Sequence, residues 1–140
     1  MTPEEKRLVE VTFAQIQPIA REAAALFYGR LFEIAPAFRH LFKHDMDAQG
    51  MKLMQTIGVA VAHLDHLDEV VPAVRKLGQR HVHYGVKPED YAVVGEALLW
   101  TLEQGLGAAF TPAVKDAWAT VYGVLASTMQ EAAYSLAVAV

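Results

Sequence analysis

Apolar residues recur every three or four positions along most of this chain, the spacing of one face of an α-helix. Thr2 is followed by Pro3 and, three positions after it, by Glu5. A capping residue, a proline in the first turn and an acidic residue at this spacing are typical of a helix start. The pattern therefore predicts a first helix that runs to about Gln17.

A second helix is predicted from Pro18 to about Ala35, and Pro36 breaks it before a short helical turn. The helix carries one face of apolar and aromatic residues, and the turn continues it: Ala24, Tyr28, Leu31, Phe32, Phe38, Leu41 and Phe42. A polar corner around His44 and Asp45 comes next.

Two longer stripes follow this corner. The first stripe begins with the polar residue Gln49 and continues with Leu53, Thr56, Ile57, Ala60 and Leu64. The second belongs to a helix that starts near Glu69, tolerates Pro72 in its first turn and ends at Gly85. Its predicted inner side consists of Val70, Val74, Leu77, His81 and Tyr84.

Pro88 begins a further helix through about Leu106, and Thr111 with Pro112 begins the last one. Their predicted inner residues are Val94, Ala97, Leu98 and Leu102, then Val114, Trp118, Val121, Tyr122, Leu125 and Met129. No stretch alternates as a strand would, and no linker or repeat divides the chain. We therefore predict six or seven helices in one all-α domain over residues 1–140.

Composition narrows the class of protein. The 140 residues are 54% hydrophobic, which is enough to build one core and to line an internal cavity. The 12 basic and 16 acidic residues give a net charge of −4 without a basic stripe, so no nucleic-acid partner is expected. The absence of cysteine excludes disulfides and thiolate ligands, so any metal needs histidine, carboxylate or methionine.

We expect no targeting signal at either end of the sequence. The N-terminus lacks the basic segment and apolar core of a secretory signal, which favours a cytoplasmic protein. The apolar stretch at 132–140 is shorter than the roughly 20 residues that span a bilayer, so no membrane insertion is expected.

His81 is the strongest candidate for chemistry. Among six histidines it alone lies within an apolar stripe, whereas His63 and His66 are interpreted as a solvated pair. Neutral imidazole in an apolar pocket suits the iron of a porphyrin. A single histidine of this kind is more often structural, so the residues opposite it decide the interpretation.

Tyr28 and Gln49 are the discriminating residues. A buried phenol and a buried amide both need hydrogen-bond partners, so two of them directed to one cavity indicate a polar guest or ordered water. The alternative places both side chains at the surface. Phe42 has two interpretations as well, either packing against a flat ligand or belonging to the core.

These residues together resemble the globin family over nearly the whole chain. The resemblance rests on the order Tyr28, Pro36, Phe42, Gln49, Leu53, His81, Tyr91 and Trp118, and on the stretches LFYGRLFEIAP, KLMQTIG, LGQRHVHYGV and DAWATVYGVLA. Within the family, the chain is similar to the bacterial single-domain branch related to flavohaemoglobins and neuroglobins. The resemblance implies a globin fold, a 3-over-3 helical sandwich around a pocket for haem b (iron protoporphyrin IX).

The resemblance also implies roles for single residues. His81 would be the proximal ligand of a pentacoordinate iron, and Tyr28 with Gln49 would stabilise bound O2, NO or CO from the distal side. Phe42 would pack against the haem as an aromatic wedge, and Leu53, Leu77 and Val94 would form apolar pocket walls. Lys52 and Arg80 would lie near the propionates, and Tyr91 would lie behind His81. Reversible gas binding is the implied function.

One departure concerns the proximal side. Flavohaemoglobins that oxidise nitric oxide pair the proximal histidine with a tyrosine and a glutamate. Tyr91 matches the tyrosine, but the position of the glutamate falls on Ala133, while Glu131 lies about 200° away around the helix. An incomplete triad favours a tight oxygen binder over a dedicated dioxygenase.

Two alternatives stay open at this point. A nitric oxide dioxygenase or peroxidase-like enzyme would need a separate reductase, since the sequence has no reductase domain or phosphate-binding glycine loop. A globin-fold module without haem, such as a sensor, is the third interpretation. The oligomeric state is expected to be a monomer or homodimer.

Overall fold

Helices account for the regular structure of the described chain. The computed structural model describes residues 1–42, 45–83, 87 and 89–139, with side chains at all of these except 78, 80–83 and 131–139. The α-helices in this part are α1 (Pro3–Ile16), α2 (Ala20–Ile34), α3 (Met46–Ala62), α4 (Val71–His83), α5 (Asp90–Leu106) and α6 (Pro112–Ala139). Short 3₁₀ helices are η1 (Gln17–Ile19), η2 (Pro36–Leu41), η3 (Leu67–Glu69) and η4 (Gly107–Ala109). This content confirms the predicted all-α class.

The capping hydrogen bonds confirm the predicted starts of the first and last helices. The Glu5 backbone N–H donates to Thr2 Oγ1 at 3.1 Å, and the Thr2 N–H donates to the Glu5 carboxylate at 3.1 Å. At the last helix, the Val114 N–H donates to Thr111 Oγ1 at 3.2 Å. These side chains satisfy amide groups that the first helical turn leaves without backbone acceptors.

Three predicted details of the helices were wrong. The second helix begins at Ala20 instead of Pro18, and the fourth begins at Val71 instead of Glu69, because a 3₁₀ turn precedes each of them. Thr56, predicted to face inward, is exposed, and its hydroxyl donates to the Lys52 carbonyl at 2.8 Å. A hydroxyl that bonds within its own helix needs no partner in the core. The predicted start at Pro88 and end at Gly85 lie outside the described residues.

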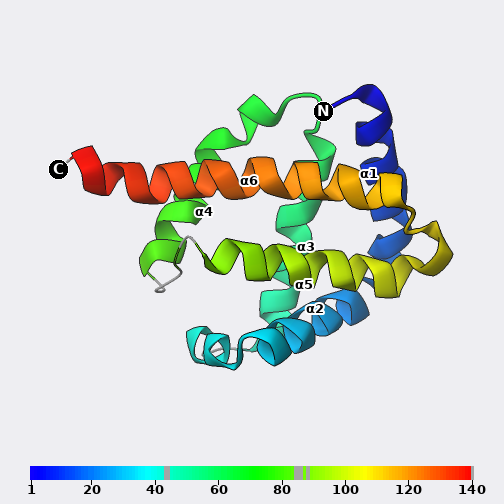
Figure 1. The fold of residues 1–140 in the computed structure, drawn as a ribbon, viewed down its shortest axis with the longest axis horizontal. Coiled ribbons are helices and arrows are strands. Elements are labelled where there is room, and N and C mark those ends of the chain that lie inside the picture. Colours follow the sequence, from blue (N-terminus) through cyan, green and yellow to red (C-terminus); the bar gives the residue numbers. More distant parts are fainter. Residues whose placement is uncertain (43–44, 84–86, 88, 140) are drawn as a thin grey trace.

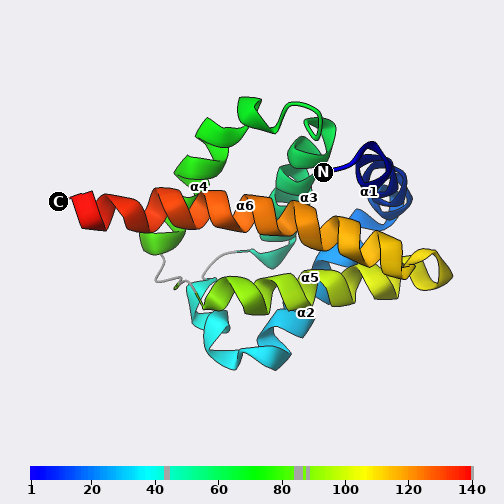
Figure 2. The same cartoon turned by 45° about the horizontal axis from the view of Figure 1, so that its top comes forward.

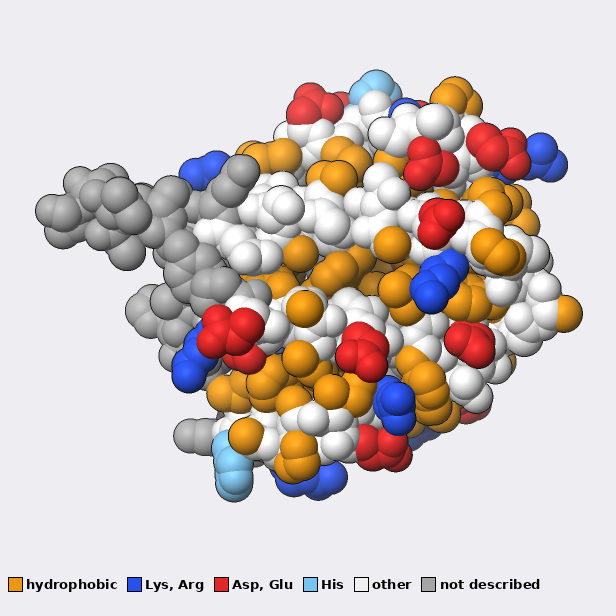
Figure 3. Space-filling model, in the orientation of Figure 1, with side chains coloured by type: hydrophobic (Ala, Val, Ile, Leu, Met, Phe, Trp, Pro, Cys, Tyr) orange, Lys and Arg blue, Asp and Glu red, His pale blue; other side chains and the backbone are white. Residues whose placement is uncertain are grey.

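The helices pack in two groups that meet where α5 contacts α6. Figure 1 shows α5 and α6 antiparallel, with α3 crossing behind them, and Figure 2 shows the same crossing from another side. α6 packs against α1 and α4, while α2 packs against α3 and α5. Apolar side chains gather along the band between α5 and α6 in Figure 3. No helix among the described residues is long and apolar enough to cross a membrane.

The core has two clusters of buried side chains. The larger joins α1 to α6 through Trp118, which is 2% exposed and donates its indole N–H to Thr12 Oγ1 at 2.9 Å. The smaller cluster, hereafter the Tyr28 cluster, centres on the buried residues Phe27, Tyr28, Leu31 and Ala97 of α2 and α5. The candidate site is built on this second cluster.

Candidate functional site

Tyr28 and Gln49 meet in the folded chain, although 21 positions separate them. The Gln49 side-chain amide donates to the Tyr28 hydroxyl across 3.3 Å. The tyrosine is 7% exposed and Gln49 is half-buried, so both polar groups lie at the edge of an apolar environment. The alternative that placed both residues at the surface was wrong.

Aromatic rings surround the Tyr28 phenol. The Phe42 ring meets it edge-on with centroids 5.2 Å apart, and the Phe27 ring does so at 4.9 Å. Phe32 lies 6.1 Å from Tyr28 and 5.6 Å from Phe42. Tilted and edge-on contacts of this kind suit the charge distribution of aromatic rings and hold Tyr28 in one orientation.

Other predicted site residues belong to the same cluster. Leu53 on α3 and Val94 on α5 pack against it, as does Phe42 after η2. All three are only half-buried, although they are apolar and lie together. They therefore leave apolar surface beside the Tyr28 and Gln49 polar groups, which fits a flat apolar cofactor with a polar ligand.

The environment of Tyr28 keeps its hydroxyl protonated. Burial raises the pKa of the Tyr28 phenol above its usual value, because the surrounding apolar groups disfavour the phenolate. The hydrogen bond from Gln49 offsets part of this effect. The Tyr28 O–H is therefore available as a hydrogen-bond donor throughout the physiological pH range.

The residues expected on the opposite side of the pocket belong to α4. The backbone of His81 lies in this helix, one turn after Leu77, which is half-buried. Residues four positions apart share a helix face, so the backbone puts both on the same side of α4. The side chains of His81 and Arg80 lie outside the described residues, and their roles stay predictions. Lys52 is exposed on α3, and its propionate contact also stays a prediction.

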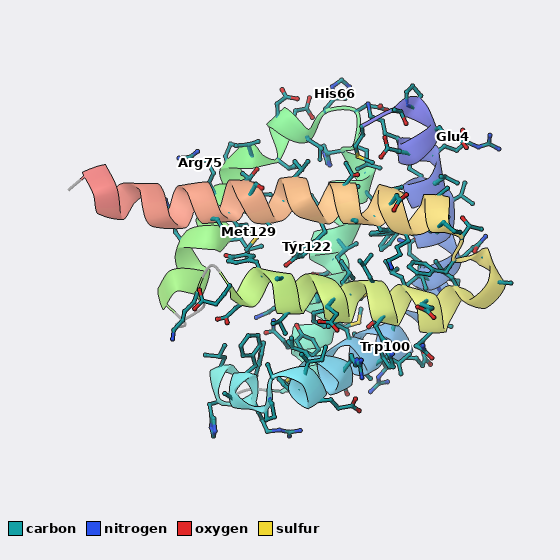
Figure 4. The ribbon with its side chains drawn as sticks, in the orientation of Figure 1. Glu4, His66, Arg75, Trp100, Tyr122 and Met129 are labelled. Carbon is teal, nitrogen blue, oxygen red and sulfur yellow. The ribbon has the colours of Figure 1, made fainter. Side chains whose placement is uncertain are left out.

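Tyr91 is buried at the start of α5 and is fixed there by a residue of α6. The Tyr122 hydroxyl donates to the Tyr91 backbone carbonyl at 2.6 Å. A Cβ atom on Gly95 would lie 2.8 Å from the Tyr122 ring, so the glycine makes room for it. Figure 4 shows Tyr122 between α6 and α5. The side chains of Glu131 and Ala133 lie outside the described residues.

Sequence reasoning assigned Tyr122 to the core stripe and missed its contact with Tyr91. The signal was weak, because a tyrosine four positions after Trp118 fits an ordinary helix face. The structure adds a second missed feature, a pocket of about 210 Å³ between α2 and α3 that Tyr28 lines. Two residues of its lining, Arg21 and Asp47, are charged and gave no sequence signal beyond that of ordinary surface residues.

His63 and His66, which follow the end of α3, lie away from this site. His63 Nδ1 is 2.8 Å from the Val59 carbonyl, and His66 is exposed, as Figure 4 shows. Asp65 between them pairs with Lys6 at 2.9 Å. Within the described part of the chain, no group of three or more potential metal ligands comes together.

The amino-acid sequence is similar to those of known proteins. The Globin family model matches residues 25–129. Neuroglobin-1 of Oncorhynchus mykiss is 29% identical over 143 residues, which cover 92% of this chain and 90% of that protein. The flavohemoproteins of Bordetella parapertussis and Bacillus subtilis are each 31% identical, covering 92% and 85% of this chain. The chain spans 33% and 31% of their lengths.

Proposed function

The chain belongs to the globin family, whose members bind haem b and diatomic gases, and we propose that it binds oxygen reversibly between Tyr28 and His81. The observation that most supports this proposal is the contact between Tyr28 and Gln49 inside an apolar cluster. Two donors at the edge of an apolar pocket suit a small ligand with partial negative charge. NO and CO are ligands of the same size.

Haem b, when bound, supplies the iron at which the gas is held. His81 provides the imidazole ligand, Phe42 packs against the cofactor, and Leu53, Leu77 and Val94 provide apolar walls. Lys52 and Arg80 pair with the propionates. The fit rests on the half-buried apolar side chains Phe42, Leu53 and Val94, whose remaining surface a flat apolar group would cover.

The polar pair acts on the gas ligand. The raised pKa of Tyr28 keeps its proton on the hydroxyl, so the hydroxyl donates to the ligand. Gln49 donates to Tyr28 Oη, which leaves the Tyr28 proton directed elsewhere. Hydrogen bonds that form only with the ligand in place slow its escape more than they speed its arrival. High oxygen affinity follows.

The direct test is the role of His81. The protein should take up haem and give a Soret band that shifts on reduction and on addition of carbon monoxide. Substitution His81→Gly should abolish the histidine-ligated ferrous spectrum, and added imidazole should restore it by occupying the space of the lost ring. The control His66→Gly, at an exposed position, should keep the parent spectrum. An unchanged spectrum in His81→Gly, with native far-ultraviolet circular dichroism, would remove His81 from the proposed role.

A second candidate function is nitric oxide dioxygenation or a peroxidase-like activity with a separate reductase. Similarity to flavohemoproteins and the buried Tyr91 favour it. The measurement is the nitrate formed per haem with reductant supplied. A yield that stops near one supports simple gas binding, whereas continued turnover supports the enzyme.

We also propose a finer placement within the family. The stretches LFYGRLFEIAP and LGQRHVHYGV resemble Hell's Gate globin, which supports a bacterial single-domain globin of the flavohaemoglobin- and neuroglobin-like branch. We propose one domain over residues 1–140, a cytoplasmic location and a monomer or homodimer. Sedimentation of the holoprotein over a range of concentrations tests the oligomeric state.

A further inference from the structure

Two of the five methionines in this chain line one pocket. The pocket, of about 210 Å³, lies between α2 and the start of α3, and Met46 and Met51 belong to its lining. It opens to solvent, since the side chains of the lining residues Arg21 and Asp47 are 75% and 64% exposed. Small molecules dissolved in water therefore reach both thioether groups.

Met46 differs from Met51 in its surroundings. Met46 is half-buried and packs against the Tyr28 cluster, as Phe42 and Leu53 do. Met51, which is 47% exposed, is a surface residue of α3. Met46 therefore has one side toward the solvent-filled pocket and another toward the aromatic surroundings of the Tyr28 hydroxyl.

The other methionines provide internal references. Met54 is 8% exposed and belongs to the larger core cluster. Met129 is half-buried on α6, away from α2, as Figure 4 shows. A thioether reacts with a dissolved oxidant only where the oxidant reaches it, so Met54 should react slowly in the folded protein.

Hydrogen peroxide converts a thioether to a sulfoxide. The Met46 sulfur donates an electron pair to one peroxide oxygen, the O–O bond breaks, and a sulfur–oxygen bond forms. The second oxygen leaves as water with both protons, so the sulfur is oxidised and the peroxide is reduced. An apolar side chain thereby becomes polar, and methionine sulfoxide reductases reverse the change.

A sulfoxide at Met46 competes for the Tyr28 proton. Gln49 donates to Tyr28 Oη at 3.3 Å, so the tyrosine's own proton is directed elsewhere, and in the proposed function it meets the gas ligand. A sulfoxide oxygen accepts hydrogen bonds, and Tyr28 lines the same pocket as Met46. A hydroxyl that donates to the sulfoxide no longer holds the ligand, so the ligand escapes faster.

We infer that Met46 is a modification site at which hydrogen peroxide weakens oxygen binding, through a sulfoxide that takes the hydrogen bond of Tyr28. The inference rests on the proposed function, because Tyr28 must hold the bound gas. The oxidant class is a small uncharged peroxide, and hydrogen peroxide itself is the probe.

The experiment treats the carbon monoxide complex of the haem-loaded protein with hydrogen peroxide, so that the iron is occupied while the methionines react. Peptide mass spectrometry should find Met46 and Met51 oxidised well before Met54. After catalase has removed the peroxide and oxygen has replaced carbon monoxide, oxygen dissociation should be at least about threefold faster than in the untreated protein. Methionine sulfoxide reductases A and B together should restore the original rate.

Two leucine variants separate the pocket methionines, since leucine keeps an apolar side chain of similar volume. Met46→Leu should release oxygen at the parent rate and lose the response to peroxide. Met51→Leu should keep the response. Met46→Gln introduces a polar acceptor without oxidation, so untreated Met46→Gln should release oxygen about threefold faster than the parent protein.

Three results would each overturn the inference: oxidation of Met46 no faster than that of Met54, unchanged oxygen dissociation in the oxidised parent protein, or a peroxide response that persists in Met46→Leu. Failure of the proposed function gives a different result, because Tyr28→Phe then leaves oxygen dissociation unchanged. If the inference alone fails, Tyr28→Phe still accelerates oxygen dissociation, whereas oxidation of the parent protein does not.

Discussion

At the scale of single residues, the site depends on polar groups placed in apolar surroundings. Tyr28 is 7% exposed and has three aromatic neighbours, yet its hydroxyl lies within reach of Gln49. Burial both orients this hydroxyl and keeps it protonated. The contribution of Tyr28 to gas binding can therefore be measured by removing one oxygen atom.

Tyr28→Phe keeps the ring and its packing while it removes the hydrogen-bond donor. We expect oxygen dissociation to accelerate about tenfold or more, since a hydrogen bond to a charged acceptor contributes about 1.5–3 kcal/mol. Stopped-flow replacement of oxygen by carbon monoxide measures this rate. Carbon monoxide dissociation serves as the internal control, because this less polarised ligand should respond less. Equal effects on both ligands would indicate a change in pocket shape.

Tyr122 offers a test of pH dependence. Burial raises the pKa of this phenol above its usual value of 10.0. Above pH 10 the unfolded chain therefore loses this proton while the folded protein retains it, and the free energy of unfolding falls as pH rises. Tyr122→Phe should reduce this slope, as measured by urea denaturation between pH 9 and about pH 11. Identical slopes would show that Tyr122 ionises at its ordinary pKa.

At the scale of elements, the crossing of α2 and α3 decides where Tyr28 and Gln49 meet. The two helices approach so closely that a Cβ atom on Gly50 would lie 2.8 Å from the Ala24 Cβ. Ala24 precedes Tyr28 by one helical turn, and Gly50 follows Gln49 directly. The close approach therefore sets the separation between the tyrosine hydroxyl and the glutamine amide.

Gly50→Ala should push α3 away from α2. We expect a loss of about 1–3 kcal/mol in the free energy of unfolding from overpacking, less any gain in helix propensity. Oxygen dissociation should also accelerate, because Gln49 moves with α3. Gly29→Ala on α2 is the matched control, since a Cβ atom there would meet nothing within 4 Å. It should stabilise the protein by about 0.5–1 kcal/mol. Urea denaturation of both variants makes the comparison, and equal stabilisation would mean that the crossing is adaptable.

At the scale of the whole molecule, a buried polar contact joins the first and last helices. The Trp118 indole donates to Thr12 Oγ1 at 2.9 Å across 106 positions of sequence. The Thr12 hydroxyl also donates to the Leu8 carbonyl at 2.6 Å, so it is oriented by its own helix. The contact ties α1 to α6, which in turn packs on α4.

Thr12→Val keeps the shape of the side chain but leaves the buried Trp118 N–H without its acceptor. The expected cost is about 1–3 kcal/mol in the free energy of unfolding, measured by urea denaturation with tryptophan fluorescence as the signal. Thr56→Val is the control, because that exposed hydroxyl donates to the Lys52 carbonyl within α3. Its effect should stay within about 0.5 kcal/mol. Similar losses in both variants would assign the effect to helix propensity instead of the α1–α6 contact.

Local patterns in the sequence were sufficient for the helices and for several site residues. The capping pairs at Thr2 and Thr111 and the stripe around Trp118 depend on neighbours a few positions away, so they could be predicted without a fold. Thr56 and the starts of α2 and α4 were mispredicted. The Thr56 hydroxyl bonds within its own helix, and a 3₁₀ turn precedes each of the two α-helices.

Only the tertiary structure decided how distant residues combine. It placed the Gln49 amide on the Tyr28 hydroxyl, the Tyr122 hydroxyl on the Tyr91 carbonyl, and a pocket between α2 and α3. Helical periodicity reports which face of a helix is apolar, but it carries no information about the angle or distance at which two helices cross. That distance depends on small residues such as Gly50 and on the rings packed beside them, and it is what turns separate polar positions into one site.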